Sequence, residues 1–228
     1  MAVSPAVAST VSHPLAAITG NGPGDGPGDG TGYGRGGRGP NADPSATPGD
    51  GTRLRDGSGY GPGNGPGMRD GTCDCLTITA DQGTLTEAQR STVAAMAQEE
   101  KLAHDLYVAF AAKYDTNAFD RIANAESQHL TAVRALMDRY EITDPTAGQP
   151  DGTFSDSTVQ ATYDRLLAQG TAGEQQAFEV GRTVEQTDID DLQQALEGLS
   201  AADVKQVYTH LLDASRRHLA AFDRWATR

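Results

Sequence analysis

Apolar residues recur at alternating steps of three and four through most of the second half of the chain, which is the spacing of one face of an α-helix. A short helix is predicted to follow Ser155 and to end at Gly170. No segment shows the alternation of apolar and polar residues that is typical of β-strands, so the fold class is predicted to be all-α. The pattern also predicts four long helices, over about Thr86 to Tyr114, Asn117 to Tyr140, Gly173 to Glu197 and Ser200 to Ala226.

Residues suited to helix ends mark these boundaries. Thr86 begins the first helix, Ser155 is expected to cap the short one, and Gly198 ends the third long one. Ser200 is expected to cap the last helix, with Asp203 in place of the glutamate of a capping box. About 32 residues then separate the second long helix from the third. Because antiparallel neighbours need only a short turn, this connection predicts that these two helices run parallel.

Polar residues interrupt the apolar stripes near the middle of each long helix. Glu100 lies on the first stripe, Glu126 and His129 on the second, Glu185 on the third and His218 on the fourth. A carboxylate on a buried stripe is costly unless a partner neutralises it. Five such positions over four helices predict a polar layer across the core of a bundle, and a metal site would explain all of them together.

The residue types favour iron or manganese, because carboxylates and imidazoles bind these metals and a carboxylate can bridge two ions. Glu126 and His129 are three residues apart and project from one face of a helix. Known di-metal bundles use one glutamate from each of two helices and a Glu-x-x-His pair from each of the other two. Other interpretations remain open for single positions, since a core histidine often bonds the backbone and a core glutamate can sit in an ion pair. Glu99 points about 100° away from Glu100 and is expected to be solvated.

Composition divides the chain into two parts. Residues 1–83 hold 21 of the 27 glycines and 9 of the 11 prolines, and they contain no glutamate. Such a segment cannot bury enough surface to offset its ordering entropy, so we predict a disordered tail at 1–83 and a helical domain at 84–228. Cys73 and Cys75 are separated by one residue, which gives at most a strained disulfide or half of a metal site, and we interpret them as incidental.

Charge and targeting signals limit the partners. From Leu85 onward, 23 acidic residues outnumber 13 basic ones, which argues against nucleic acid and anionic membranes. No stretch approaches the roughly 20 apolar residues of a membrane span. The segment Met1 to Gly20 lacks the basic residues and compact apolar core of a signal peptide, so the cytoplasm and secretion or the cell envelope both remain open. The polar outer faces of the predicted helices show no obvious contacts for assembly into a cage, so we expect a monomer or a homodimer.

Several motifs resemble those of a known family. Glu100-Lys101-Leu102-Ala103-His104-Asp105-Leu106-Tyr107 resembles the Glu-x-x-Ala-x-x-x-Tyr pattern of the first rubrerythrin helix. The segment from about Leu85 to Trp225 more closely resembles the uncharacterised bacterial family called domain of unknown function 2202. The matching pieces are Glu99 to Ala103, Glu126 to His129, Asp188 to Leu192 and Ser215 to Leu219. The resemblance implies a ferritin-like four-helix bundle, with the short helix in the crossover, and no established activity.

One position departs from the simple di-iron pattern. The last helix carries Ser215 where a fourth carboxylate is expected. Asp188, three residues after Glu185 on the same stripe, could supply that carboxylate, and a rubrerythrin-like third helix with two acids at this spacing offers a precedent by resemblance. Asp213 falls off the stripe and is the weaker candidate. Without a fourth carboxylate the site could hold one metal ion, or two unequal ones.

The leading hypothesis for function is an oxidoreductase that uses O₂ or peroxide to oxidise Fe(II) or another donor. Its cofactor would be two iron ions, with manganese as the alternative, held by Glu100, Glu126, His129, Glu185 and His218 with Asp188. Glu126 or Glu185 would bridge them. A non-catalytic iron-handling module and a metal-free helical interaction domain are the alternatives. The chain has no rubredoxin-like segment with four cysteines, so it carries no built-in electron relay of that kind.

Overall fold

The structure is a computed structural model that describes residues 76–114 and 116–227. Its described part is all-helical and contains no strands, as the sequence predicted. The predicted tail over residues 1–75, with Cys73 and Cys75, lies outside the described residues. The helices are α1 (Glu87–Lys113), α2 (Asn117–Arg139), α3 (Ser157–Gly170), α4 (Glu174–Leu196) and α5 (Ala202–Ala226).

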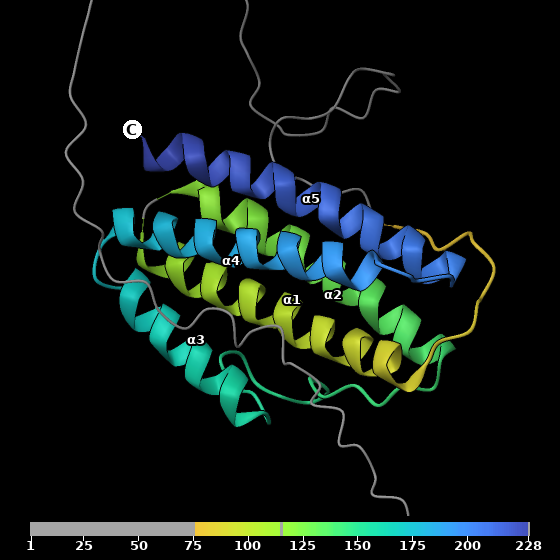
Figure 1. Cartoon of the computed structure of the whole chain (residues 1–228). Helices are drawn as coiled ribbons and strands as arrows, with labels where there is room; N and C mark the ends of the chain where they lie inside the picture. The colour runs from red at the N-terminus through yellow and green to blue at the C-terminus, as the bar shows by residue number, and fades with distance from the viewer. Residues whose placement is uncertain (1–75, 115, 228) are drawn as a thin grey trace, which may run out of the picture. The chain divides into compact units, whose positions relative to one another are not determined.

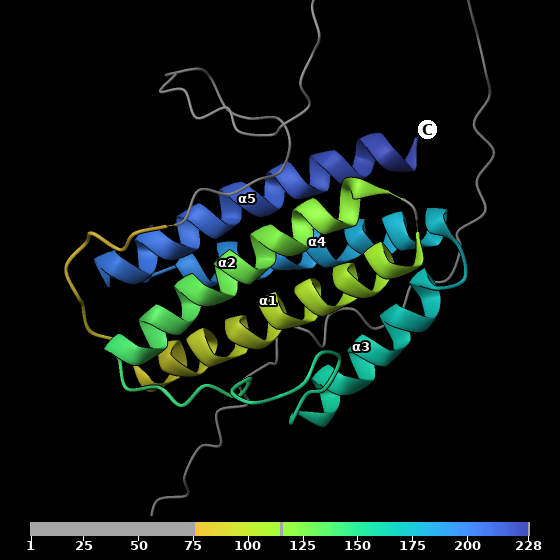
Figure 2. The same cartoon turned by 180° about the vertical axis from the view of Figure 1, so that it is seen from behind.

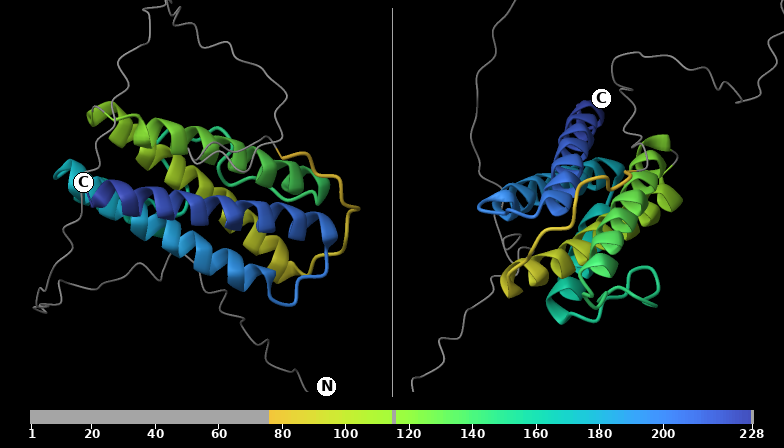
Figure 3. Two further views of the ribbon diagram at one scale, coloured as in Figure 1. Left: turned by 90° about the horizontal axis from the view of Figure 1, so that it is seen from above. Right: turned by 90° about the vertical axis from the view of Figure 1, so that its right-hand side faces the viewer.

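The four long helices lie lengthwise beside one another as two hairpin pairs (Figures 1 and 3). α1 packs mainly against α2, and α4 packs mainly against α5. α2 and α4 run in the same direction, as the long connection between them predicted (Figure 1). α3 belongs to that connection and packs on the outside of α1 and α4 (Figure 2).

Two apolar clusters form the core, one toward each end of the long helices. One is rich in aromatic rings, including Tyr107, Phe110, Phe119, Phe178 and Phe222. The other is mainly aliphatic and includes Val93, Met96, Leu136, Leu192 and Leu211. On every long helix the boundary between the clusters falls at the mid-length residues that the sequence predicted as a polar layer. The stripe of α4 contains Gly181 because a Cβ there would come within 2.7 Å of the Phe222 ring.

The predicted helix ends are correct in part. Thr86 caps α1 in a reciprocal capping box with Gln89, and Gly198 follows α4 with a φ of 67°, a left-handed conformation suited to glycine. The prediction for Ser155 was wrong. Asp156 caps α3, because its carboxylate accepts hydrogen bonds from the backbone N–H groups of Thr158 and Val159.

The predicted cap of the last helix was also wrong. The N-cap of α5 is Ala201, which makes no side-chain hydrogen bond, so Ser200 does not cap it. Asp203 is fully buried instead, and its carboxylate accepts hydrogen bonds from the hydroxyl of Tyr140 at 2.7 Å and the N–H of Gly83 at 3.3 Å. Contacts from distant parts of the chain thus occupy the side chain that was expected to cap the helix.

Residues 76–83 form a strap across the ends of α2 and α5, although the sequence placed them in the tail. The side chain of Gln206 accepts hydrogen bonds from the N–H groups of Thr79 and Ala80. Leu76 and Ile78 pack against the aliphatic cluster. The ordered part of the chain therefore begins before residue 84. Among the described residues, no helix is long and apolar enough to cross a membrane.

Candidate metal centre

Five polar side chains predicted from the stripes come together between the two apolar clusters. Each is at most 3% exposed, although a carboxylate or imidazole normally prefers water. They come from all four long helices: Glu100 from α1, Glu126 and His129 from α2, Glu185 from α4 and His218 from α5. The helical period places each of them at the same level as its neighbours, so the predicted polar layer is present.

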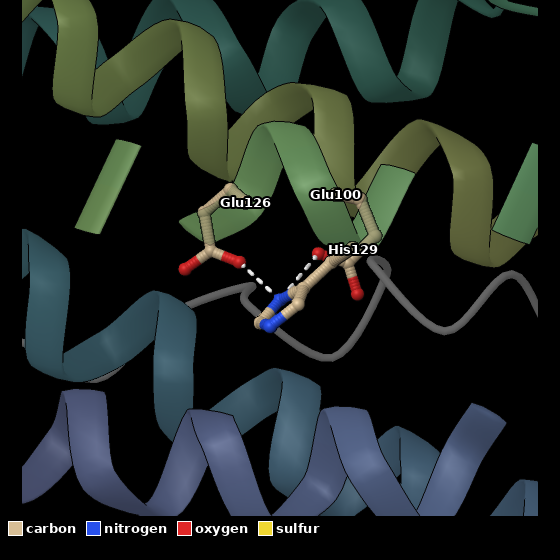
Figure 4. Close-up of side chains that lie close together, drawn as sticks. All are labelled: Glu100, Glu126 and His129. Atoms are coloured by element: carbon tan, nitrogen blue, oxygen red, sulfur yellow. Dashed lines mark hydrogen bonds and ion pairs between the residues drawn. The ribbon is translucent and has the colours of Figure 1, made fainter. Parts of the chain in front are cut away.

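The first group lies within the α1–α2 hairpin and consists of Glu100, Glu126 and His129 (Figure 4). The Nδ1 atom of His129 lies 2.7 Å from Oε2 of Glu126 and 3.3 Å from Oε2 of Glu100. Glu126 and His129 are one turn apart on α2, which explains why both reach the same point. Oε1 of Glu100 has no hydrogen-bond partner among the described residues.

The second group joins the two hairpins and consists of Glu126, Glu185 and His218. The Nδ1 atom of His218 lies 2.9 Å from Oε1 of Glu126 and 3.5 Å from Oε2 of Glu185. The rings of His129 and His218 are nearly parallel, with their centroids 5.6 Å apart. Glu126 is therefore common to both groups, and it turns one carboxylate oxygen toward each histidine.

The geometry suits metal binding. In each group, one potential ligand atom from every residue lies within 4.8 Å of the others. Carboxylate oxygens and imidazole nitrogens are suitable ligands for iron, manganese and zinc. A carboxylate shared by two such groups is placed as a bridging ligand would be. Each group offers three protein ligands and could hold one ion.

The burial of these groups shifts their pKa values. Burial raises the pKa of Glu100 to about 7, and the charge of Glu126 adds to this effect while His129 opposes it. Burial also raises the pKa of Glu185, again with help from Glu126. For Glu126 burial acts in the same direction, but His218 and His129 outweigh it and hold its pKa well below its usual value. Burial lowers the pKa of His218, but Glu126 and Glu185 outweigh that effect and raise it to about 10.

Burial and the balance of charge in the site together produce these shifts. Three carboxylates share a site with only two imidazoles, so negative charge is in excess and part of it is suppressed by protonation. A metal cation would reverse this balance, because it favours the ionised form of every carboxylate near it. Strongly shifted pKa values in a buried cluster are typical of functional sites.

Asp188 and Ser215 lie beside the two groups, and neither belongs to them. The hydroxyl of Ser215 donates a hydrogen bond to Oδ2 of Asp188 at 2.5 Å. Burial raises the pKa of Asp188 well above its usual value, and the charge of Glu100 contributes next. Asp188, which the sequence suggested as the fourth carboxylate, thus accepts a hydrogen bond from the residue at the expected position, and its role as a metal ligand stays a prediction.

Two further residues complete the surroundings. Tyr107 donates a hydrogen bond of 2.7 Å to Oε1 of Glu185 and so fixes the orientation of that carboxylate. The prediction for Glu99 was wrong, because it is only 6% exposed. Helix α1 contacts α2, α3 and α4, so more than one stripe of it is buried. The sequence contained one sign of this burial, because Glu99 lies four residues before Ala103, which is also buried.

A small cavity of about 20 Å³ lies against the centre, between α1 and α4. That volume suffices for about one water molecule. Four carboxylates besides Glu126 line it, from Glu99, Glu100, Glu185 and Asp188, together with Leu102, Ala103, Val184 and Thr187. The polar layer is thus adjacent to internal space, and most of the cavity's polar lining is acidic.

Comparison with known proteins identifies the family of the chain. An uncharacterised protein of Methanocaldococcus jannaschii, MJ0754, is 35% identical over 140 residues, which cover 61% of this chain and 76% of that protein. The crystal structure of this hypothetical protein superposes with a TM-score of 0.63 at 33% identity, over 65% of this chain and 85% of the other. Because that relative is archaeal, the comparisons do not support an expectation restricted to bacteria. The model of an uncharacterised protein domain, DUF2202, matches residues 89–227, and the chain belongs to this family.

Proposed function

We propose that this chain is a ferritin-like protein that binds two metal ions, most suitably iron with manganese as the alternative, and uses them for oxidation chemistry. The donor would be Fe(II) or another reductant, and the acceptor would be O₂ or peroxide. One observation carries the proposal. Two buried carboxylate–imidazole groups share Glu126, on four helices whose directions match those of a ferritin-like bundle.

The ligands would be Glu100 and His129 on one side, Glu185 and His218 on the other, and Glu126 between them. Bound iron would supply the redox chemistry by passing electrons from the donor to O₂ or peroxide. The protein positions the ligands: Tyr107 holds Glu185 by a hydrogen bond, and the spacing along α2 aims Glu126 and His129 at one point. The aromatic cluster packs at one end of the site.

Metal content of the full chain tests the proposal. Metal-free protein is incubated anaerobically with Fe(II), freed from excess metal and analysed by mass spectrometry. We expect about two iron ions per chain, because the two groups provide two sets of ligands. Asp138→Asn, which changes an exposed acid on the same helix as Glu126, should bind as much iron as the wild type. A content below about 0.3 ions per chain would overturn the proposal and favour a metal-free interaction domain.

Activity is tested separately. Oxygen is added to the Fe(II)-loaded protein and to a Glu126→Ala, His129→Ala variant, and formation of Fe(III) is followed by absorbance. An oxidoreductase should oxidise Fe(II) at least about tenfold faster than the variant, a modest acceleration for a catalysed reaction. If the wild type bound its full content of iron but oxidised Fe(II) no faster than the variant, the protein would instead be a non-catalytic iron-handling module.

A further inference from the structure

A second set of acidic side chains lies on α1 and α4 beside the candidate metal centre. Glu99 lies on α1, and Asp188 and Asp191 lie one turn apart on α4. Glu99 and Asp188 line the cavity that also borders Glu100, Glu126 and Glu185. The cavity therefore adjoins both the centre and two members of this set, and Asp191 lies one turn beyond Asp188 on α4.

Glu99 has no function in the fold that would explain its burial. It is only 6% exposed, and neither of its carboxylate oxygens has a hydrogen-bond partner among the described residues. A buried carboxylate without partners costs several kcal/mol by order of magnitude. Oδ1 of Asp188 and Oδ2 of Asp191 are likewise buried without a partner in the described part of the chain. Glu99 and Asp188 line the cavity, so a cation in it could bind their oxygens without partners.

The two acids on α4 are more exposed than Glu99. Glu99 is buried, whereas Thr187, Asp188 and Asp191 are partly exposed. Burial and the charge of Asp190 raise the pKa of Asp191 to about 6.

We propose that Asp191, Asp188 and Glu99 form an access route for divalent metal ions, which leads between α1 and α4 to the buried glutamate–histidine centre. The inference rests on the proposed function, because it requires a metal-binding centre at the inner end. The three acids are not close enough together to form a ligand group like the two described above. They are therefore suited to passing an ion inward by transient contacts, and negative potential along a cleft raises the rate at which cations arrive.

The rate of metal uptake tests this route. Metal-free full-length protein is mixed with Co²⁺ in a stopped-flow instrument, uptake is followed by visible absorbance, and the final cobalt content is measured after gel filtration. Glu99→Gln keeps the shape of the side chain and removes its charge. We expect it to slow uptake at least about tenfold while the final content stays at the wild-type value. Asp191→Asn should slow uptake by about threefold, because it lies nearer to solvent.

Asp190→Asn is the matched control, since it removes the same charge from an exposed neighbouring position on α4. Its uptake rate should stay within about twofold of the wild type. Uptake by Glu99→Gln at the wild-type rate would overturn the access route and leave the proposed function intact. A lower final cobalt content in that variant would also overturn it, because Glu99 would then be a ligand of the centre. If wild-type protein bound no cobalt, both the proposed function and the route would be wrong.

Discussion

Helix α1 carries two buried charged sites side by side that differ in how their charges are satisfied. At the first, the Lys101 ammonium forms an ion pair with Asp105 and donates to the carbonyl of Pro150 at 2.9 Å. Asp105 accepts further hydrogen bonds from the N–H of Gly152 at 2.8 Å and from the ring of His104 at 2.9 Å. At the second, Glu100 joins two other carboxylates that have only two histidines as partners.

The difference separates a structural site from a candidate functional one. One cation and one anion balance each other at Lys101 and Asp105, and the remaining hydrogen-bonding capacity is used to hold the connection between α2 and α3. The metal centre has excess carboxylate and contains oxygens without partners among the described residues. A buried ion pair is tolerated when it is paired and hydrogen-bonded, whereas an unbalanced cluster requires something else to complete it.

The largest expected effect concerns Glu126, which belongs to both metal-ligand groups. Glu126→Gln removes the charge that they share, so we expect the bound iron to fall at least about tenfold, measured by mass spectrometry after anaerobic loading. Asp105→Asn, one turn along α1 from Lys101, should keep its full iron content as long as it folds. Equal loss of iron in both variants would mean that the two sites are not independent.

The next effect should appear in stability. Asp105→Asn leaves Lys101 buried without an anion, so we expect the free energy of unfolding to fall by about 3–5 kcal/mol, measured by urea denaturation of metal-free protein. Replacing both residues, as Lys101→Met with Asp105→Leu, should recover most of this loss. A change below about 1 kcal/mol in the single variant would show that the pair is not a structural anchor.

Metal should stabilise the unbalanced site and leave the balanced one unchanged. At about 100 times its dissociation constant, an ion that binds only the folded state contributes about 2.7 kcal/mol. Calorimetry of wild-type protein should therefore show a rise in Tm of roughly 5–10 °C with Mn²⁺ compared with chelator. Glu126→Gln should show no such rise, and a similar rise in both proteins would place the ion elsewhere.

The smallest effect should be a pH dependence. Burial would raise the pKa of Asp105, but hydrogen bonds from His104, Lys101 and Gly152 outweigh it and lower the pKa below its usual value. A depressed pKa in the folded state stabilises the protein at pH values above the unfolded pKa, and this contribution is lost as the pH falls through the folded value. The stability advantage of the wild type over Asp105→Asn should thus shrink below about pH 4. An advantage that persisted at pH 2 would contradict this assignment.

The features that depend on the helical period could be predicted from the sequence. The five residues of the polar layer, the parallel course of α2 and α4 and the start of α1 follow from spacing along single helices and from the length of one connection. Whether these five bind metal stays a prediction. The burial of Glu99 was missed because only the stripe through Glu100 was considered, whereas α1 is packed on more than one side.

Long-range pairings account for the other differences. Asp203 meets Tyr140 and Gly83, which lie 63 and 120 residues away along the chain, so local capping rules chose the wrong role for it. Asp156 caps α3 in place of its neighbour Ser155, because one oxygen of the Asp156 carboxylate accepts hydrogen bonds from two N–H groups. The hydrogen bond between Asp188 and Ser215 also joins two helices, α4 and α5. From the sequence, one could only suggest that the two residues lie at the same level of the bundle.

The strap at residues 76–83 affects how the domain can be isolated. The family match begins at residue 89, so a fragment trimmed to that match would lose the strap and also Thr86, the cap of α1. Tyr140 and the buried Asp203 would lose the Gly83 N–H that they share, and the aliphatic cluster would lose Leu76 and Ile78. A shortened protein should therefore be expressed from a start site ahead of residue 76. Hydrogen bonding and packing mark the beginning of this domain better than sequence similarity does.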